Sequence, residues 1–424
     1  MASRILIILS VFFLSTGAWS QEANYDESSV PFYVLPELLK SADRTIIETS
    51  DDWEKIRRPE VLGLFQQYVY GRVPEGDYSQ SYEVLSQARK TLGGAADRYE
   101  IRITIERKNR RLFFDLLLFL PADAKKAVPL FLGYNFNGNH TVHPDPGILI
   151  TKSWVRNTRD ALVAYNQANE LSRGASASRW PVEIILEHGY GLATMYYGDI
   201  DPDYYDSFQN GIHPLFYGPG QNRPEQDEWG SIAAWAWGLS RAMDYLETRK
   251  DIDASRVAVI GHSRLGKTSL WAGASDERFA MVVSNNSGCG GAALSRRAFG
   301  ETVKRINTSF PHWFCRNFHE YNTRVAELPV DQHMLIALMA PRPVYIASAE
   351  EDRWADPRGE YLSGFFAAPV YNLYEPTMLD FDSPQIDAPV NDTRIGYHIR
   401  SGGHDVTNFD WQQYLDFADR HLAE

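Results

Sequence analysis

The stretch "VAVIGHSRLGKTSLW" (Val257–Trp271) is compatible with two different folds. Gly261, Gly266 and the Lys-Thr pair that follows match G-x-x-x-x-G-K-[ST], the pattern of a loop that binds phosphate. Alternatively, Ser263 stands where an apolar strand turns sharply into a helix, which is how hydrolases present a nucleophile. Both interpretations need a strand before the turn and a helix after it, so residues elsewhere in the chain must distinguish them.

The order of polar residues along the chain favours the hydrolase. Several apolar stretches precede the motif, whereas a phosphate-binding loop usually follows the first strand of its domain. In α/β-hydrolases an Asp or Glu and then a His follow the serine, each after a strand. Here Asp352 follows the apolar residues 344–347, and His404 follows residues 395–399. We therefore predict a triad in which Ser263 attacks, His404 is the base and Asp352 orients the histidine.

The apolar stretches around the motif predict the fold class. The predicted strands are residues 99–106, 112–121, 128–135, 191–201, 257–260, 279–288, 344–347 and 395–399. Several are continuously apolar, as strands covered on both faces are. A helix is predicted over residues 229–248, and others follow the later strands. This alternation predicts an α/β-hydrolase, with a mainly parallel central sheet and helices on both faces in three layers.

The N-terminal segment predicts export. "MASRILIILSVFFLSTGAWSQ" has an early Arg4, an apolar run and then small residues up to Ser20. We predict a signal peptide at residues 1–20, with an uncleaved anchor as the alternative, and a secreted or periplasmic protein. Residues 21–424 are predicted to be a single catalytic domain with an insertion at about 140–180. That polar insertion either covers the strand ends or is a peripheral decoration.

Composition limits the partners. The chain has 424 residues and a net charge of -13, which argues against nucleic acid or an anionic membrane as the main partner. We expect no membrane contact after signal cleavage and no cofactor. We also expect no metal, because the histidines lack metal-binding spacing. The chain is expected to be a monomer. Cys289 and Cys315 are predicted to form a disulfide, with two buried thiols as the alternative.

A longer stretch resembles a known family. "GHSRLGKTSLWAGASDERFAMVVSNNSGCGGAALSRR" (residues 261–297) is similar to the nucleophile region of the glucuronoyl esterases, whose motif is G-x-S-R-x-G-K. The resemblance continues through "FGETV", "SAEEDRWADPRGE" and "SGGHD", and covers most of the chain from about Tyr99. These carbohydrate esterases of the α/β-hydrolase superfamily cleave esters between glucuronic acid on xylan and lignin alcohols. The resemblance therefore implies a glucuronoxylan or lignin–carbohydrate ester as substrate.

The resemblance also implies roles for individual residues. The backbone N–H of Arg264 is placed for an oxyanion by the turn itself, and the resemblance adds the Arg264 side chain. Lys267 and Glu301 would hydrogen-bond sugar hydroxyls, and Trp354 would lie against the sugar ring. Without the resemblance, Lys267 would be interpreted as a solvated helix residue and Trp354 as a core aromatic.

One position departs from the family pattern. Some members carry the triad acid as Glu in the segment that matches "SNNSG", where this chain has Asn286. An amide cannot balance the imidazolium charge as a carboxylate does. The acid is then expected in the later loop, where Asp352 is best placed, with Glu350, Glu351 and Asp356 as rivals.

Two other functions are compatible with the fold. Another esterase, such as a carbohydrate acetyl esterase, or a serine peptidase would use the same triad. A small acetyl group, however, would make no use of the polar cluster formed by Arg264 and Lys267. A carbohydrate-binding protein with a vestigial triad is the third hypothesis, and the presence of all three triad residues argues against it.

Overall fold

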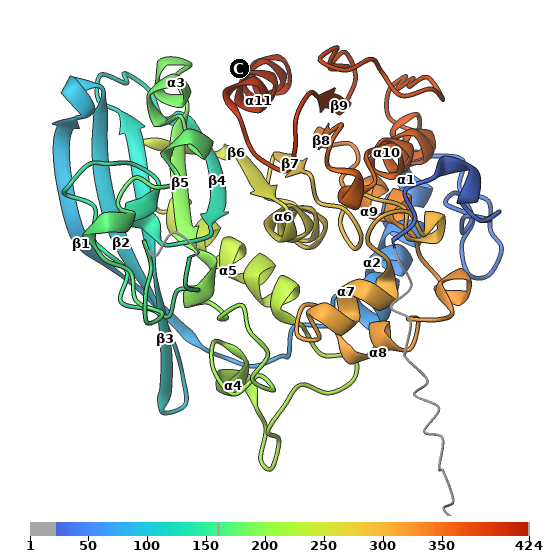
Figure 1. Ribbon diagram of the computed structural model, residues 1–424, viewed down its shortest axis with the longest axis horizontal. Helices are drawn as coiled ribbons and strands as arrows, with labels where there is room; N and C mark the ends of the chain where they lie inside the picture. The colour runs from blue at the N-terminus through green and yellow to red at the C-terminus, as the bar shows by residue number, and fades with distance from the viewer. Residues whose placement is uncertain (1–22, 159–161, 423–424) are drawn as a thin grey trace, which may run out of the picture.

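The computed structural model describes residues 23–158 and 162–422, so the signal peptide predicted at residues 1–20 lies outside the described residues. Within them, nine strands form one sheet in the order β1-β2-β3-β5-β4-β6-β7-β8-β9 (Figure 1). The strands are β1 Ser79–Thr91, β2 Ala96–Arg107, β3 Arg110–Pro121, β4 Val128–Asn135, β5 Gly191–Tyr196, β6 Ile252–His262, β7 Met281–Asn285, β8 Val344–Ala349 and β9 Ile395–Arg400.

The sheet is mainly parallel, which confirms the predicted α/β-hydrolase class. Strands β5, β4, β6, β7, β8 and β9 pair in parallel, and β1, β2 and β3 add an antiparallel extension next to β5. Strand β1 was not predicted. It is a largely exposed edge strand rich in Ser, Gln and charged residues, so it lacks the apolar pattern that marks buried strands.

Helices cover both faces, as predicted. They are α1 Ser50–Asp52, α2 Arg58–Tyr68, α3 Val182–Glu187, α4 His213–Phe216, α5 Ser231–Leu246, α6 Arg264–Ser275, α7 Val303–Ser309, α8 Arg316–His319, α9 Gln332–Ala337, α10 Pro357–Tyr371 and α11 Asn408–His421. Alternate residues of β6 point to opposite faces. Ala258 and Ile260 join the core of α3 and α11, whereas Val257 and Val259 join that of α5 and α6 (Figure 1). No helix among the described residues is both apolar enough and long enough to cross a bilayer.

The predicted disulfide is wrong, because Cys289 and Cys315 are both free and buried. The Cys315 thiol points toward the carbonyl oxygen of Gln67, at 3.8 Å. The Cys289 thiol instead lies within the electrostatic reach of Glu301 and Lys267. Each thiol packs in its own part of the core, and burial raises the pKa of both. The prediction assumed that two cysteines in the same loop-rich stretch would face each other, but their side chains point in different directions.

The predicted insertion packs against the sheet and reaches the loops at its edge. Residues 140–158 and 162–180 contain short 3-10 turns in place of long helices or strands. At the end of this segment, Arg179 Nε donates to Asp405 Oδ1 at 2.6 Å, directly beside His404. The Arg179 carbonyl accepts the indole N–H of Trp411 on α11 at 2.8 Å. The segment therefore contacts the carboxyl ends of the strands, where sites of this architecture form.

Candidate active site

Ser263 occupies a sharp turn between β6 and α6. Its backbone has φ 58° and ψ −128°, a conformation that costs a residue other than glycine about 1–3 kcal/mol. A Cβ on Gly261 would lie 1.8 Å from the carbonyl oxygen of Leu265, and one on Gly266 would lie 3.0 Å from Ser287 Cβ. Gly261 is thus required by the close packing of the turn, and Gly266 is favoured by its tight contact with the residues after β7. Such a turn exposes the serine hydroxyl at the edge of the sheet.

His404 and Asp352 meet on the loops after β9 and β8. Asp352 Oδ2 accepts hydrogen bonds from His404 Nδ1 at 2.6 Å and from Asn286 Nδ2 at 2.8 Å. Burial favours the protonated acid, but the two hydrogen bonds and the His404 charge outweigh it and lower the pKa of Asp352. Asp352 is therefore a carboxylate at neutral pH. It fixes the proton of His404 on Nδ1 and leaves Nε2 as the acceptor.

The rival acids lie in other environments. Both carboxylate oxygens of Asp356 bind Arg297, at 2.8 and 3.2 Å, and the same carboxylate caps α10. The side chains of Glu350 and Glu351 are exposed. Of the four acids considered from the sequence, Asp352 is the one that contacts the histidine.

Arg264, the first residue of α6, is held by a buried carboxylate. Its Nη1 donates to Asp203 Oδ2 at 2.6 Å and to the Tyr197 hydroxyl at 3.3 Å. Its Nε is buried and has no hydrogen-bond partner among the residues that the structure describes. A buried donor without a partner is costly, and it is typical of a site that a ligand completes.

Asp203 was not identified from the sequence. Its Oδ1 accepts hydrogen bonds from His312 Nε2 at 2.9 Å and from Trp313 Nε1 at 2.8 Å. Burial alone would raise the pKa of Asp203, but these donors and Arg264 hold it below its ordinary value. A signal for it was present. Acids occupy every second position in "GDIDPD" (residues 198–203), where the strand predicted at 191–201 ends.

The three residues implied to bind sugar lie together. Lys267 Nζ is 3.9 Å from Glu301 Oε2 and also donates to the Ser287 carbonyl, and the Glu301 N–H donates to the Trp354 carbonyl at 3.0 Å. Lys267 is 4% exposed, so it is not a solvated helix residue, and Trp354 is 37% exposed, so it is not a core aromatic. Burial lowers the pKa of Lys267 and raises that of Glu301 despite their attraction. The pair is thus held largely away from water, beside the exposed Trp354.

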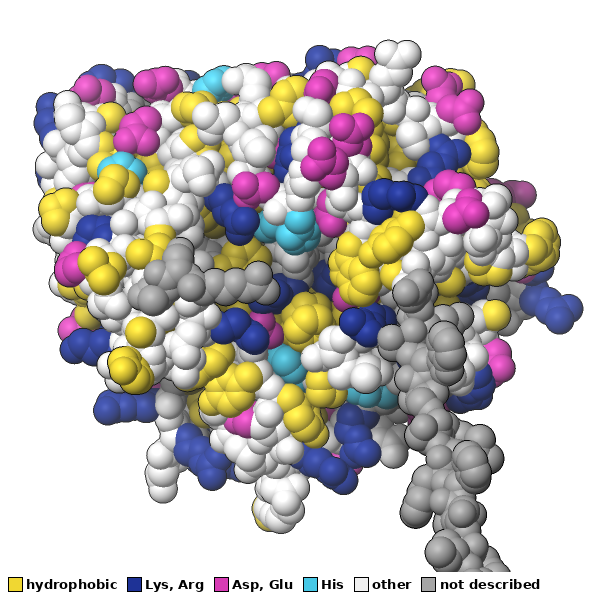
Figure 2. Space-filling model, viewed as in Figure 1, with side chains coloured by type: hydrophobic (Ala, Val, Ile, Leu, Met, Phe, Trp, Pro, Cys, Tyr) yellow, Lys and Arg dark blue, Asp and Glu magenta, His cyan; other side chains and the backbone are white. Residues whose placement is uncertain are grey.

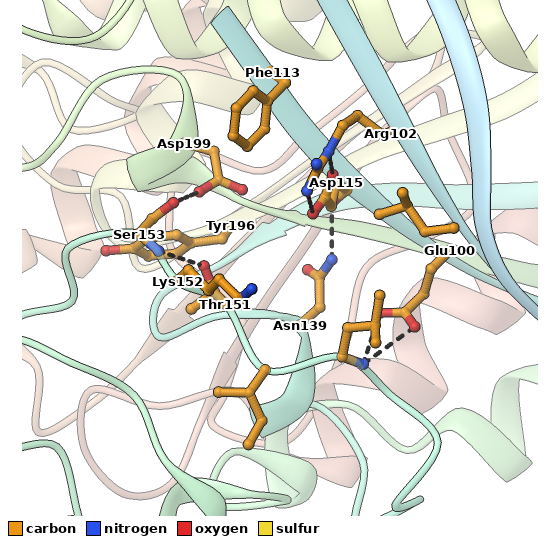
Figure 3. A pocket seen from close by; sticks show the side chains of 13 residues that line it. Glu100, Arg102, Phe113, Asp115, Asn139, Thr151, Lys152, Ser153, Tyr196 and Asp199 are labelled. Carbon is orange, nitrogen blue, oxygen red and sulfur yellow. Dashed lines mark hydrogen bonds and ion pairs between the residues drawn. The ribbon is translucent and has the colours of Figure 1, made fainter.

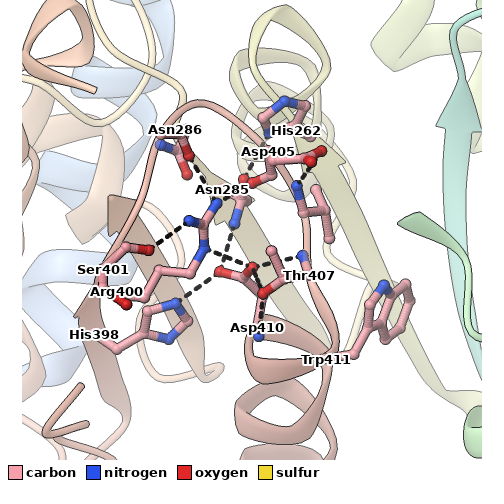
Figure 4. A network of polar contacts seen from close by, with 12 residues as sticks. His262, Asn285, Asn286, His398, Arg400, Ser401, Asp405, Thr407, Asp410 and Trp411 are labelled. Carbon is pink, nitrogen blue, oxygen red and sulfur yellow. Dashed lines mark hydrogen bonds and ion pairs between the residues drawn. The ribbon is translucent and has the colours of Figure 1, made fainter. Parts of the chain in front are cut away.

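Arg400 holds the loop that carries His404 (Figure 4). Arg400 Nε donates to Asp410 Oδ2 at 2.8 Å, and Asp410 is fully buried at the start of α11. The guanidinium also donates at 2.9, 3.0 and 2.6 Å to three carbonyls of the loop, those of Ser401, Gly403 and Asp405. A guanidinium can do this because its donors form a rigid fork. Sequence reasoning overlooked Arg400, although it lies four residues before the histidine.

His262 supports the ring of His404. The two ring centroids are 4.4 Å apart, and His262 Nδ1 is 2.6 Å from Asn285 Oδ1. The Asn285 amide in turn donates to the Tyr414 hydroxyl at 2.7 Å. Burial, together with the neighbouring His404, holds the pKa of His262 well below its usual range, so this ring is neutral. Because His262 directly precedes Ser263, the contact also brings His404 next to the turn.

We expect Arg400→Lys to lower kcat on a glucuronate ester about tenfold or more, with little change in KM. Lysine keeps the charge beside Asp410 but loses the fork that binds three carbonyls, and small shifts of a catalytic group cost large factors in rate. Steady-state kinetics measure both constants. The matched control is Arg394→Lys, a half-buried arginine paired with Glu375 at 2.6 Å. A KM effect with normal kcat would contradict the positioning role.

The surroundings of the turn form a charged hollow. Figure 2 shows histidine, basic and acidic side chains gathered around a depression near the centre of this face. No group of three or more His, Cys, Asp or Glu residues in the described ranges is arranged to hold a metal ion.

The fold and the serine turn define a hydrolase of the α/β class. Residues 217–374 match the family model described as glucuronyl esterase of fungi. The carbohydrate esterase MZ0003, from an unknown prokaryotic organism, is 52% identical over 98% of each chain. The solved glucuronoyl esterase of Solibacter usitatus is 48% identical, covers 93% of this chain and 100% of its own, and superposes with a TM-score of 0.88.

A fungal relative aligns over part of the chain. The 4-O-methyl-glucuronoyl methylesterase 1 of Phanerochaete chrysosporium is 34% identical over 43% of this chain and 41% of its own length. Together with the relatives above, this match confirms the resemblance noted from the sequence. The chain belongs to the glucuronoyl esterase family, and it is a carboxylic ester hydrolase.

Proposed function

We propose that the chain hydrolyses esters between (4-O-methyl-)glucuronic acid of glucuronoxylan and lignin alcohols, through an acyl-enzyme on Ser263. The observation that carries the proposal is the 2.6 Å hydrogen bond from His404 Nδ1 to Asp352 Oδ2 next to the serine turn. The name of the fungal methylesterase supports the sugar part of the substrate. The lignin alcohol rests on the family resemblance of the motif.

The reaction follows from this hydrogen bond. Ser263 Oγ adds to the ester carbonyl carbon while His404 Nε2 takes the hydroxyl proton. Asp352 stabilises the imidazolium through Nδ1–H. When the tetrahedral intermediate collapses, the bond to the alcohol oxygen breaks and that oxygen takes the proton from His404. A water activated in the same way then releases glucuronate and restores the serine.

The negative oxygen of the tetrahedral intermediate needs hydrogen-bond donors. The backbone N–H of Arg264 is at the first position of α6, where helical N–H groups lack intrahelical partners and the helix dipole favours negative charge. The Arg264 guanidinium, anchored to Asp203, has a buried Nε–H that finds no partner in the described part of the chain. Each oxyanion donor of this kind is worth about 10²–10³ in kcat.

The sugar is recognised by Lys267, Glu301 and Trp354. Hydroxyl groups of a uronate can accept from Lys267 and donate to Glu301, which lie 3.9 Å apart and so can bind the same sugar. The exposed ring of Trp354 provides an apolar face for the pyranose.

We expect Lys267→Met to reduce kcat/KM on methyl glucuronate about 10–100-fold, and much less on an aryl acetate. Methionine fills the same volume, but the hydrogen bond from a charged group to a sugar hydroxyl is lost, which is worth about 1.5–3 kcal/mol. Parallel assays of both substrates measure the ratio. Lys304→Met, an exposed lysine on α7, is the control. An equal loss on the two substrates would make Lys267 a structural residue.

The experiment that tests the whole proposal pairs three substrates. The wild type should hydrolyse a glucuronate ester of an aryl-alkyl alcohol and methyl glucuronate far faster than an acetylated sugar. A preference for the acetyl ester would favour the acetyl esterase, and binding without turnover of any of the three would favour the vestigial carbohydrate-binding protein.

The proposal includes export of the protein, secreted or periplasmic, and this rests on the sequence of residues 1–20. The buried free thiols lend it no support, because neither needs an oxidising compartment. Mass analysis of the protein from the medium or periplasm should find Gln21 as its N-terminus. Retention in the cytosol with Met1 intact would contradict it.

A further inference from the structure

A cavity of about 430 Å³ is lined by none of the proposed catalytic and sugar-binding residues (Figure 3). It is on the same edge of the sheet as Ser263. Strand β3 is three positions from β6, and neighbouring strands are about 4.8 Å apart, so the separation is about 14 Å. Because β3 runs antiparallel to β5, its first residues face the edge at which the parallel strands end.

The walls of the cavity come from the sheet and the insertion. Phe113 and Asp115 of β3 face Arg102 of β2, and Arg102 donates to the two Asp115 oxygens at 2.8 and 2.9 Å. Residues 149–153 of the insertion form the opposite side. Figure 3 shows Asp199, which follows β5, directed toward the space between these walls.

Two further carboxyl groups make the cavity acidic. Asp199 accepts the Ser153 hydroxyl at 2.5 Å, and Glu100 accepts the Leu149 N–H at 3.0 and 3.1 Å. Burial raises the pKa of each to about 7. The guanidinium of Arg102 hydrogen-bonds Asp115, and each of the two other carboxyl groups has a donor of its own in Ser153 or Leu149. A carboxyl group has further lone pairs, and with a raised pKa also a proton, to offer to a ligand hydroxyl.

The cavity also has an aromatic wall. Phe113 is 46% exposed, although it lies in a strand, and the Arg102 guanidinium is 4.1 Å from its ring centroid. Glu100, Asp115 and Asp199 line the cavity together with Arg102 and Lys152, and the raised pKa of two of the acids leaves little net charge to attract an anion. An aromatic lignin unit would not use the carboxyls. Hydroxyl donors around an apolar ring face suit both features, and they are what a neutral pyranose or pentose offers.

We propose that this cavity binds a neutral sugar unit of the xylan main chain while the glucuronoyl ester occupies the serine site. This inference rests on the proposed function, because it takes the polysaccharide from the substrate assigned there. The cavity then selects esters that are still attached to xylan over free glucuronate esters.

Calorimetric titration with xylotetraose, a neutral ligand without an ester, tests the site directly. The wild type should bind it saturably, Phe113→Ala should weaken binding about five- to tenfold, and Phe113→Tyr should restore it. The matched control is Phe381→Ala, since Phe381 is also exposed, at 58%, with an arginine 4.9 Å from its ring. Equal weakening by the two alanine variants, or no saturable binding to the wild type, would overturn the proposal.

Kinetics separate this proposal from the proposed function. Phe113→Ala should raise KM for the methyl ester of a glucuronoylated xylo-oligosaccharide about fivefold more than KM for methyl glucuronate. An equal rise in KM for both esters would refute sugar binding in the cavity, and it would leave the proposed esterase function standing. If the wild type hydrolysed neither ester, the proposed function would fail, and the xylotetraose titration would still decide whether the cavity binds sugar.

Discussion

Ser263→Ala and His404→Ala should each reduce kcat on methyl glucuronate at least about 10³-fold, and the double variant should be scarcely slower than either single one. The serine supplies the atom that attacks and the histidine takes its proton, so neither has a function in this step without the other. Losses from groups that act as a unit do not add. Residual turnover would come from the oxyanion donors and substrate binding.

The control for this pair is Ser255→Ala, an exposed serine on the same strand, β6. It should keep wild-type kinetics. Unchanged unfolding temperatures for all variants would show that the losses are chemical. Retention of more than about a tenth of wild-type kcat by Ser263→Ala would refute the nucleophile, because triad losses are far larger.

Asp352→Asn should lower kcat about 10²–10³-fold with little effect on KM. Asparagine keeps the shape but cannot balance the imidazolium, and its amide favours the wrong histidine tautomer, a change worth about 10⁴ in serine proteases. The pKa of Asp352 is lowered, so the wild-type carboxylate is fully charged at neutral pH and the substitution removes a whole charge. Steady-state kinetics at neutral pH measure this effect.

A double variant that places the carboxylate at position 286 in place of 352 tests the same assignment. Asn286 Nδ2 lies 2.8 Å from Asp352 Oδ2, so a carboxylate at position 286 comes close to the same place. Asn286→Glu in the Asp352→Asn background should regain at least about tenfold in kcat, since a nearby negative charge again supports the imidazolium. Glu350→Gln and Glu351→Gln, at exposed positions, are the controls. If Asp352→Asn kept a near-normal kcat while Glu351→Gln lost most of it, the triad acid would be Glu351 and the assignment of Asp352 would be wrong.

The strands and the serine turn could be predicted because their signals are local. Continuous apolar runs mark strands buried on both faces, and the glycine at position 261 reflects the close approach of the Leu265 carbonyl within the same turn. The order of Ser263, Asp352 and His404 could be interpreted because the ends of parallel strands converge at one edge of the sheet. The edge strand β1 escaped prediction, since an exposed strand carries no apolar pattern.

The roles of the supporting residues were not predicted, because their contacts form only when loops fold back on one another. Asp203 holds Arg264 across 61 positions, and Arg400 reaches Asp410 only after the loop between them has folded back. The alternating acids of residues 198–203 mark the end of a strand, but they do not indicate which of them meets Arg264. The disulfide prediction was wrong for the same reason, since packing around Cys289 and Cys315 sets the direction of each thiol.

The order of strands and polar residues along this chain was therefore sufficient to indicate an α/β-hydrolase and the residues at its strand ends, and the resemblance of residues 261–297 indicated the glucuronoyl esterase family. The contact of Asp352 with His404, the burial of Lys267 beside Glu301 and the acidic cavity below the insertion arise only when separate strands are aligned in one sheet. Hydrogen bonds and desolvation act over a few ångströms in space, whatever the distance along the chain. Backbone periodicity is set by neighbours, whereas pKa shifts and side-chain directions are set by whatever the fold brings near.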